Sequence, residues 1–421
     1  MSRIVMAVFG SLGDLHPFIA LALELRERGH QISFATSEVY REKIQVLGFE
    51  FHAVRPDIDP NDVELARDLM DAKKGTERII RELLMPSLRD VYADLSLAAK
   101  DADLMIAGEV VYAAPILADK TGLPWISTSL APISFTSAHD PFVPPTQQWF
   151  GSLRFLGAGV HRILISFAKK TVRSWGEPAR EFRRELGLDA DIDPIFDDKY
   201  SRFLHLALFS RVLGEPQPDW HQPTVQTGFA FYDGKKDLGK MPDGLREFLA
   251  SGEPPIVFTL GSAAVWVAGD FFHESAAAAK KLKRRAVLIL GENKPPENLG
   301  ENIAAFDYAP YGEVFPHAAC VVHQAGIGTT SQVLRAGVPH LIMPFSHDQP
   351  DNAARCARLG VARTISRESY TAERAARELG EILGNVSYKN RALEAKRVVD
   401  SENGVKSACN EIEELLKRGK S

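Results

Sequence analysis

Apolar and amphipathic segments alternate along the first half of the chain. Residues 3–9 form a short apolar run, residues 18–28 carry apolar positions at helical spacing, and residues 31–35 form a second apolar run. A buried strand, a surface helix and another buried strand produce this pattern. It continues through strand-like runs at residues 49–54, 103–107, 125–129 and 203–209. Such alternation predicts a doubly wound α/β domain with a parallel sheet.

The second half repeats the alternation after a segment dense in Pro, Gly and Asp. Its strand-like runs lie at residues 256–260, 286–290, 302–306, 321–323, 341–343 and 362–365. The Pro- and Gly-rich composition is typical of a connection between domains. We therefore expect an N-terminal domain at residues 1–214, a linker at 215–240, a second domain at 241–388 and a terminal helix at 389–421.

Three segments of the first half depart from the alternation. Residues 76–100 predict one long amphipathic helix, bent at Pro86, and residues 151–186 predict two helical pieces that meet near Trp175 and Gly176. Residues 130–150 are rich in Pro and aromatic side chains and predict no regular element. They form either a packed loop or the wall of an apolar pocket.

Composition narrows the class of protein without naming a function. The 421 residues are 45% hydrophobic and 25% charged, which is typical of a globular protein with two domains. The net charge of −5 gives no basic footprint for nucleic acid. The three cysteines have no metal-ligand spacing and fit a reducing cytoplasm. The apolar residues 4–9 are too few for a signal peptide or a membrane span, so they predict a first strand.

Polar side chains in the stretch from residue 321 to 353 follow two successive strands. Gly326 and Gly328 let a ligand approach the backbone, and a helix that begins near Thr329 offers free N–H groups to an anion. Asp348 and Gln349 follow the next strand and suit hydrogen bonds to hydroxyl groups. Glycine spacing alone indicates only a tight turn. The whole constellation predicts a diphosphate with an attached hydroxylated group, bound at the carboxyl edge of the sheet.

This stretch resembles the donor-binding signature of family 1 nucleotide-sugar glycosyltransferases, commonly H-x-G-G-x-G-T-T, A-G-V-P, P and D-Q in that order. In many bacterial members a second histidine follows the first and contacts the donor pyrophosphate. Here His323 is the first, and Gln324 holds the second place. The resemblance places both residues among the donor-binding residues. The resemblance implies that the Gln324 amide or nearby backbone N–H groups take over the phosphate contact.

The same resemblance implies the GT-B fold, in which two doubly wound Rossmann-like domains face each other across a cleft and the terminal helix returns to the N-terminal domain. It also implies a general base three residues before Pro17, which is the place of Asp14. His16 is the rival, because the pKa of histidine suits proton transfer near neutral pH. From the residues alone, Asp14 is equally well explained as a helix cap.

Two further positions match donor contacts of the family. Ser262, in a G-S turn after the first strand of the second half, corresponds to a diphosphate contact, although Ser also favours helix caps. Tyr308 corresponds to the aromatic residue that stacks on the nucleotide base, and core burial is the other explanation for it. Inverting members of the family need no metal, and no His, Cys or carboxylate cluster has metal-ligand spacing. We therefore expect no cofactor besides the nucleotide-sugar co-substrate.

A narrower resemblance, to bacterial rhamnolipid-type and sterol-type glycosyltransferases, lies at residues 217–234, 308–311 and 346–353. It implies an inverting enzyme that moves a hexose from a UDP- or dTDP-sugar to a hydroxyl of a hydrophobic small-molecule or lipid acceptor. Peripheral contact with a membrane is a further expectation for such an acceptor. The alternatives are a nucleotide-sugar 2-epimerase and a non-catalytic nucleotide-sugar-binding partner protein. The sequence leaves the acceptor, the sugar, the choice of UDP or dTDP and the oligomeric state open.

Overall fold

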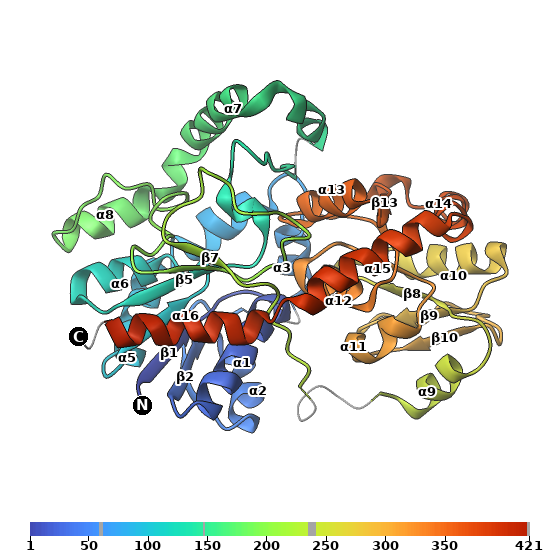
Figure 1. Cartoon of the computed structure of the whole chain (residues 1–421), viewed down its shortest axis with the longest axis horizontal. Helices are drawn as coiled ribbons and strands as arrows, with labels where there is room; N and C mark the ends of the chain where they lie inside the picture. Colours follow the sequence, from blue (N-terminus) through green and yellow to red (C-terminus); the bar gives the residue numbers. More distant parts are fainter. Residues whose placement is uncertain (59–61, 146–147, 235–240, 419–421) are drawn as a thin grey trace.

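A computed structural model describes residues 1–58, 62–145, 148–234 and 241–418, and Figure 1 shows it as two halves side by side. Within these residues the first half holds a seven-stranded parallel sheet in the order β3-β2-β1-β4-β5-β6-β7. Its strands are β1 (Arg3–Ala7), β2 (Gln31–Thr36), β3 (Glu50–Ala53), β4 (Leu104–Ala107), β5 (Trp125–Ser129), β6 (His205–Ala207) and β7 (Thr224–Gln226).

The described part of the second half holds a six-stranded parallel sheet in the order β10-β9-β8-β11-β12-β13. Its strands are β8 (Ile256–Thr259), β9 (Ala286–Ile289), β10 (Ile303–Phe306), β11 (Cys320–His323), β12 (His340–Ile342) and β13 (Ala362–Thr364). Both sheets have helices on both faces. The predicted fold class, GT-B with two doubly wound domains, is therefore confirmed.

Helices connect the strands in both halves (Figure 1). In the first half they are α1 (Leu12–Glu27), α2 (Arg41–Val46), α3 (Val63–Leu69), α4 (Gly75–Arg78), α5 (Leu88–Ala98), α6 (Ala113–Thr121), α7 (Gly157–Val172) and α8 (Glu177–Glu185). In the second half they are α9 (Asp243–Ala250), α10 (Phe271–Leu282), α11 (Tyr311–Val314), α12 (Ile327–Ala336), α13 (Gln349–Leu359), α14 (Ala372–Gly384), α15 (Val386–Ser401) and α16 (Gly404–Arg418).

Short irregular helices complete the chain. They are η1 (Glu38–Tyr40), η2 (Ile79–Leu84), η3 (Pro132–Phe135), η4 (Gln148–Leu156), η5 (Arg173–Gly176), η6 (Ala264–Val267), η7 (Phe315–His317) and η8 (Arg367–Ser369). The helix predicted at residues 76–100 is interrupted here, because η2 is a π-helical segment and α5 begins only after Pro86. The two pieces predicted for residues 151–186 are α7 and α8, joined by η5 at Trp175 and Gly176.

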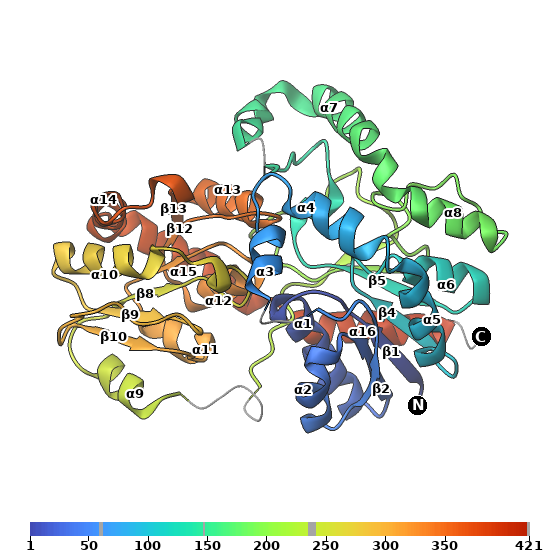
Figure 2. The ribbon, with the colours of Figure 1, turned by 180° about the vertical axis from the view of Figure 1, so that it is seen from behind.

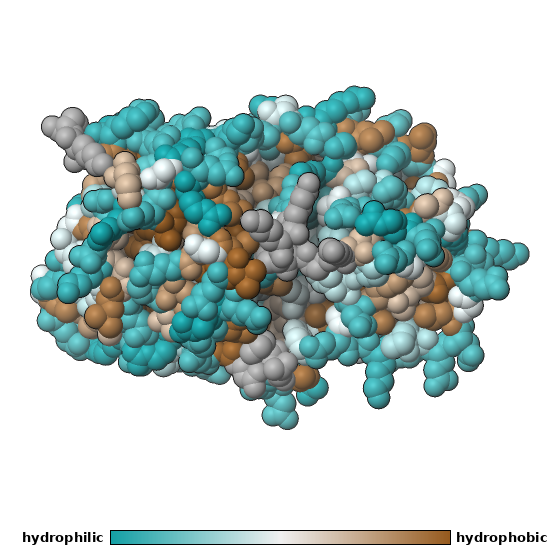
Figure 3. Space-filling model, turned by 90° about the horizontal axis from the view of Figure 1, so that it is seen from below, coloured by the Kyte–Doolittle hydropathy of each residue, from teal (hydrophilic) through white to brown (hydrophobic). Residues whose placement is uncertain are grey.

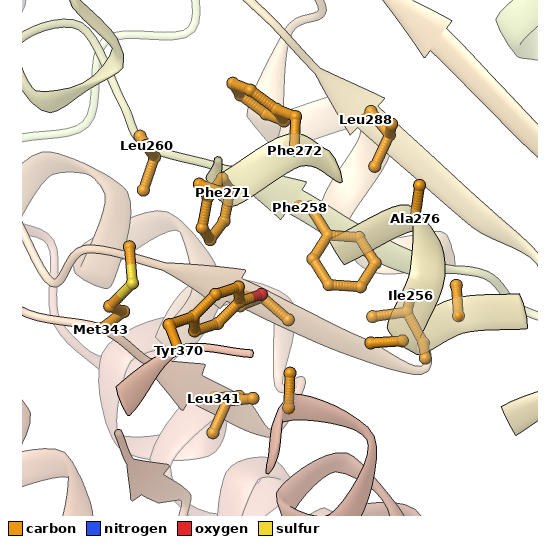
Figure 4. Packing of buried hydrophobic residues seen from close by; sticks show 14 of the residues in the cluster. Ile256, Phe258, Leu260, Phe271, Phe272, Ala276, Leu288, Leu341, Met343 and Tyr370 are labelled. Atoms are coloured by element: carbon orange, nitrogen blue, oxygen red, sulfur yellow. The ribbon is translucent and has the colours of Figure 1, made fainter. Parts of the chain in front are cut away.

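Aromatic side chains fill the core of the second half. Phe258 on β8 and Phe271 on α10 pack edge to face, and the ring centroids of Phe271 and Tyr370 are 5.0 Å apart (Figure 4). The hydroxyl of Tyr370 is satisfied by the hydroxyl of Ser275, 2.8 Å away. This packing joins α10 to the segment before α14 and holds the donor-side sheet rigidly under its carboxyl edge.

The connection between the two halves begins later than the expected linker at residues 215–240. Residues 215–234, assigned to the linker, belong to the first half, since β7 pairs with β6 there. The remaining linker residues, 235–240, lie outside the described residues. Residues 214–226 are rich in Pro although they belong to this domain. The short edge strand β7 tolerates them, because Pro outside the paired residues removes no hydrogen bond of the sheet.

The terminal helical segment is divided in two. α15 packs on the second half, where Lys389 and Lys396 donate to the carbonyls of Gly337 and Arg335 at the end of α12. α16 packs on α1 of the first half (the red helices in Figure 1). The break falls just before Gly404, where a Cβ would lie 2.3 Å from the carbonyl oxygen of Phe229. Only glycine allows the chain to pass this strand end so closely.

Candidate active site

A cleft with a volume of about 2020 Å³ separates the carboxyl edges of the two sheets. The turns after β1 and β4 line one wall, and the turns after β8, β11 and β12 line the other. Ligands bind at these edges in doubly wound sheets, because the strand ends expose helix N-termini and turns there. Of the residues proposed from the sequence, all except His323 line the cleft.

Asp14 lies in the first turn of α1, directly after β1. Ser11 is the N-cap of this helix, and its backbone N–H donates to Oδ2 of Asp14 at 2.7 Å. The Ser11 hydroxyl accepts from the N–H of Gly13 at 3.2 Å, which completes a capping box. Gly10 is required beside it, because a Cβ there would lie 2.3 Å from Oδ2 of Asp14. Asp14 therefore has the capping role, and it also faces the cleft.

The electrostatic surroundings of Asp14 favour its protonated form. Burial raises its pKa, the N–H and hydroxyl of Ser11 lower it, and the carboxylate of Glu109 raises it further, with a net upward shift. Both hydrogen bonds from Ser11 end on Oδ2, so Oδ1 is available to a substrate. His16 also lines the cleft, with its ring centroid 5.3 Å from that of Tyr232.

The turn after β11 and the turn after β8 meet at Gly261. A Cβ on Gly261 would lie 2.2 Å from Nε2 of Gln324 and 3.2 Å from Oγ1 of Thr329. Gln324 is 5% exposed, and its Oε1 has no hydrogen-bond partner among the described residues. Gly326 is the N-cap of α12, so the first free N–H groups of that helix point into the same space. The arrangement suits an anion.

The second glycine of this turn brings the two halves together. Gly328 lies in the first turn of α12, and a Cβ there would be 3.3 Å from Cα of Gly13 in α1. The N-terminal ends of α1 and α12 therefore approach each other across the cleft. The two positive helix ends repel unless an anion lies between them.

His323 lies behind the turn and does not line the cleft. Its Nδ1 accepts from the N–H of Ala325 at 3.1 Å, and its Nε2 lies 3.0 Å from Nδ1 of His340. Both rings are fully buried, and burial lowers the pKa of His323 to about 3. The donor contact expected for His323 is therefore not found here. Its neutral ring fixes the turn, in which Ala325 has a φ of +70°.

Asp348 follows β12 and faces the cleft from the donor side. Its Oδ2 accepts from Nδ2 of Asn352 at 2.6 Å. Burial raises the pKa of Asp348 to about 7, the negative charge of Asp14 adds to the shift, and the Asn352 amide partly opposes it. Nδ2 of Asn352 also donates to the carbonyl of Ala325 at 3.0 Å. Asn352 thus joins the turn after β11, which we call the anion turn, to the turn after β12 that carries Asp348.

Gln349 holds the turn that presents Asp348. Its Oε1 accepts from the N–H groups of Phe345 at 2.8 Å and Ser346 at 3.3 Å. The side chain is buried, yet the residue lines the cleft. Its carbonyl is therefore used inside the protein, and any contact with a ligand falls to its amide nitrogen.

The remaining candidates lie on the rim of the cleft. Ser262 and Tyr308 are exposed and line it from the donor side. Phe142, Trp149 and Phe150 also line the cleft, so the described part of residues 130–150 does contribute an apolar wall. Phe135 belongs instead to the core, stacked on Trp220 with centroids 3.9 Å apart.

The apolar loop is also docked onto the donor half. Asp351 on α13 accepts from the N–H of Val143 at 3.0 Å, and Arg355 donates to the carbonyl of Leu213 at 2.8 Å and pairs with Asp140. Removing one member would leave a buried charge without its partner, which is strongly destabilising. The position of the apolar wall is therefore fixed by α13, the helix that begins at the Asp348 turn.

Sequence reasoning missed the residues that support the site. Asn352, Glu109 and Gly261 shape it through contacts between segments distant in sequence. For Asn352 a signal existed, because it lies one helical turn after Asp348 and faces the same side of α13. Glu109, directly after β4, lies at the same sheet edge as Asp14, so its place after a predicted strand was also readable.

Family models match both halves of the chain. Residues 4–139 match the glycosyltransferase family 28 N-terminal domain. Residues 277–415 match the erythromycin biosynthesis protein CIII-like, C-terminal domain. The cleft lies between the carboxyl edges of the sheets that these two regions build.

Two curated relatives illustrate the range of similar proteins. The O-mycaminosyltylonolide 6-deoxyallosyltransferase of Streptomyces fradiae is 30% identical over 98% of this chain and 97% of its own length. A sterol 3-beta-glucosyltransferase of Saccharomyces cerevisiae is 25% identical over 99% of this chain, which spans only 35% of that longer protein.

Solved structures share the fold at lower identity. The glycotransferase of kitacinnamycin has a TM-score of 0.72 and 20% identity, with 99% of each chain covered. The glycosyltransferase VinC, solved with dTDP, has a TM-score of 0.69 and 21% identity, covering 99% of this chain and all of that one. Fold and cleft together define a glycosyltransferase of the GT-B class. The chain belongs to family 1 of these nucleotide-sugar glycosyltransferases.

None of the helices in the described residues has the length and apolarity needed to cross a bilayer. Likewise, no three His, Cys, Asp or Glu side chains in the described part of the chain are grouped so as to hold a metal ion.

Proposed function

We propose that this enzyme transfers a hexose, with inversion, from a UDP- or dTDP-sugar to a hydroxyl group of an apolar acceptor. One observation carries the proposal: a carboxylate, Asp14, lines the cleft from the first half, opposite a turn with the features of a diphosphate site. A transferase of this kind needs a base on the acceptor side and electrophilic groups on the donor side.

In this mechanism Asp14 is the base. The acceptor hydroxyl binds at Oδ1, loses its proton to the carboxylate and attacks the anomeric carbon of the sugar. The bond from that carbon to the diphosphate breaks on the opposite face, so the configuration inverts. Hydrogen bonds from Ser11 to Oδ2 hold the carboxylate in place during the transfer. The raised pKa of Asp14 improves its strength as a base, since proton affinity rises with pKa.

On the donor side, the N-terminal N–H groups of α12, together with Gln324 and Thr329, would hold the diphosphate and stabilise its charge as it leaves. Ser262 would add a hydroxyl and Tyr308 a stacking face for the base. Asp348 and Gln349 would receive the sugar hydroxyls. The dTDP bound in the VinC structure is of the same ligand class. We expect no metal to take part, and an assay with EDTA should proceed at an unchanged rate.

The acceptor is proposed to be lipid-like, polyketide or phenolic. Phe142, Trp149 and Phe150, which line the same cleft as Asp14, favour an apolar body, because burying apolar area contributes about 25 cal/mol per Å². That binding energy can position the reacting hydroxyl at the base. The names of the relatives agree with an apolar acceptor, since one is a transferase for O-mycaminosyltylonolide and another for a sterol.

A donor panel tests the proposal. The enzyme is incubated with an apolar alcohol and each of UDP-glucose, UDP-galactose, UDP-GlcNAc, dTDP-rhamnose and dTDP-glucose, and mass spectrometry follows free nucleotide and glycosylated product. A glycosylated product formed together with nucleoside diphosphate is the expected result. Release of nucleotide with an epimerised free sugar, whether or not acceptor is present, would contradict the proposal, and so would no turnover with any donor–acceptor pair.

A further inference from the structure

The helix α7 and the preceding segment η4 carry an unusual amount of exposed apolar surface. Among the described residues, fourteen large hydrophobic side chains are exposed, and six of them lie between residues 149 and 167. Phe155 is 81% exposed, Ile163 71% and Phe167 68%. The two opposite views in Figures 1 and 2 both place α7 at the outer edge of the molecule, away from the two sheets. A patch of this kind on a soluble protein marks an interaction surface.

The apolar side chains form one stripe along the helix. Val160, Ile163 and Phe167 follow each other at intervals of three and four residues, which places them on one side of α7. Phe155 and Leu156, at the end of η4, add to the start of this helix. The stripe has no protein partner within the described residues, since each of these side chains is exposed. We call the exposed side chains of residues 155–173 the outer face.

Charge on the outer face has a single sign. The sequence from residue 141 to 176 contains five Lys and Arg residues and no Asp or Glu. Two of the five are paired, Arg154 with Asp140 and Lys169 with Asp197. The others, which make no ion pair with any described residue, are Arg162, Lys170 and Arg173. The whole protein is acidic, with a net charge of −5, so this basic segment is a local exception.

Other side chains of the same helix line the cleft. Leu164 and Ile165 line the cleft, and Phe167 both lines it and is exposed outside. The outer face is therefore continuous with the mouth of the apolar wall. On the side of the molecule away from α7, the surface is mainly hydrophilic, with hydrophobic residues gathered toward the middle (Figure 3).

The charge pattern decides between two kinds of occupant. A second copy of the chain, docked through the same face, would bring two sets of unpaired basic side chains together, and like charges across an interface oppose association. An anionic lipid surface matches the face in both respects, because it accepts apolar side chains at the acyl boundary and basic ones at the headgroups. Amphipathic helices of this composition lie in the plane of the bilayer surface.

We propose that the outer face, residues 155–173, docks on membranes that carry anionic lipids. The apolar stripe enters the boundary between headgroups and acyl chains, while Arg162, Lys170 and Arg173 contact the lipid phosphates. The mouth of the cleft then opens beside the bilayer. This docking is independent of the transferase reaction, since it needs neither donor nor acceptor.

Vesicle flotation with the full-length protein tests the proposal. Vesicles of phosphatidylcholine mixed in equal parts with phosphatidylglycerol are compared with vesicles of phosphatidylcholine alone, in the absence of any nucleotide sugar. We expect binding to the mixed vesicles that weakens with added salt. The variant R162E/K170E should bind the mixed vesicles at least roughly thirtyfold more weakly, because each basic residue near an anionic surface contributes about fivefold. The variant F155S/I163S should lose about tenfold or more on both kinds of vesicle.

A matched control removes one exposed apolar and one exposed basic residue from elsewhere. Leu97 and Lys100 at the end of α5 are both exposed, and L97S/K100E should bind vesicles like the unchanged protein. Thermal unfolding of each variant confirms that it is folded. No flotation of the unchanged protein, or equal flotation of all variants, would overturn the proposal. Concentration-dependent dimers in light scattering that vanish in F155S/I163S would also overturn it, because they would assign the face to a second copy.

Discussion

Asp14 and Asp348 come from opposite halves of the chain and line the same cleft, and the charge of Asp14 contributes to raising the pKa of Asp348 to about 7. Burial is the larger cause of that shift. The charge of one carboxylate disfavours ionisation of the other, so their titrations are linked. In D14N the Asp348 pKa should fall, and carbon-detected NMR titration of the side-chain carboxyl measures it. An unchanged pKa would show that the two carboxylates are electrostatically separate.

The variant D14N should lose turnover by roughly two orders of magnitude or more while it binds the nucleotide almost as before. Asn keeps an oxygen for the N–H of Ser11, so the cap survives and only the base is lost. The control S11A removes the cap partner but not the carboxylate, and should cost about 1 kcal/mol of stability with most of the turnover kept. Steady-state kinetics and calorimetry check both. A comparable loss in H16A, with D14N active, would assign the base to His16.

The stability of the protein should show the raised pKa of Asp348. The unfolded carboxyl titrates near 3.8 and the folded one near 7, so between these values the folded state holds the extra proton. The unfolding free energy therefore falls as pH rises from about 4 to about 7. The neutral side chain in D348N does not titrate, so the unfolding free energy of this variant should not fall in the same way. Relative to the unchanged protein, D348N should become more stable as the pH rises from about 4 to about 7, by about 1–3 kcal/mol. Chemical denaturation at several pH values measures the difference.

A carboxylate with the opposite shift provides the control. Asp71 accepts from the N–H groups of Lys73 and Lys74, and these bonds lower its pKa. The ionised Asp71 carboxylate therefore adds to the free energy of unfolding when the pH is above the pKa of the unfolded chain. This added stability is lost as the pH falls toward the lower pKa of the folded state. D71N should therefore lose stability relative to the unchanged protein at neutral pH, and this loss should shrink in acid. If D71N and D348N changed the unfolding free energy at neutral pH in the same direction, the opposite pKa shifts assigned to Asp71 and Asp348 would be contradicted.

The variants D348A and Q349A should change sugar choice and rate more than nucleotide affinity. Both residues belong to the turn after β12, one strand further along the chain than the anion turn after β11. Calorimetry with UDP or dTDP should give nearly unchanged affinities, while kcat falls. Because Oε1 of Gln349 supports the turn, Q349E, which keeps that oxygen, separates the support from the sugar contact. A large loss of affinity for the free nucleotide would place these residues on the wrong part of the donor.

Gln324 should act on the diphosphate. It is nearly buried, faces the meeting point of two donor-side turns and has an unpartnered carbonyl, so its amide can turn to donate to a phosphate oxygen. Q324A should weaken binding of UDP or dTDP about tenfold or more, the usual effect of losing a hydrogen bond to a charged group. Q324H should retain most of the affinity, because histidine occupies this place in many relatives. Equal affinity in Q324A would show that backbone N–H groups suffice.

Acceptor efficiency should rise with apolar area. In competition assays across alcohols of increasing length, kcat/KM should increase, and free monosaccharides should be poor acceptors. The variant F142S shortens the apolar wall without touching Asp14, so it should flatten the trend. A flat trend in the unchanged enzyme, or the highest efficiency with a free sugar, would contradict an apolar acceptor site.

The fold followed from the sequence because its signals are local. Each buried strand is a short apolar run and each turn after a strand is polar, so the parallel sheets and their ligand edge could be predicted. The positions of Asp14, Gln324 and Asp348 on that edge followed from the same rule. The structure places all three in the cleft.

The role of His323 and the packing of the terminal helices depend on contacts between segments far apart in the chain. His323 carries the family signature, yet its role is decided by His340, which reaches it only because β11 and β12 are neighbours. The helical pattern at residues 389–418 contains a stop signal at Asn403-Gly404, and the structure ends α15 just before it. Periodicity reports which side of a helix is apolar but not which body it packs against, so the packing of α15 on one half and α16 on the other could not be predicted.

The divided terminal segment sets a condition for building hybrid enzymes. Since α15 packs on the donor half and α16 on α1, exchanging acceptor halves between two relatives needs a second junction near Glu402, besides the one after β7. With only the first junction, α16 of one parent would meet α1 of the other. The contacts of Arg28 with Asn410 and Glu413, at 2.8 and 2.9 Å, would then join unmatched sequences. A library of such hybrids should therefore yield folded members mainly among those that inherit α1 and α16 from the same parent.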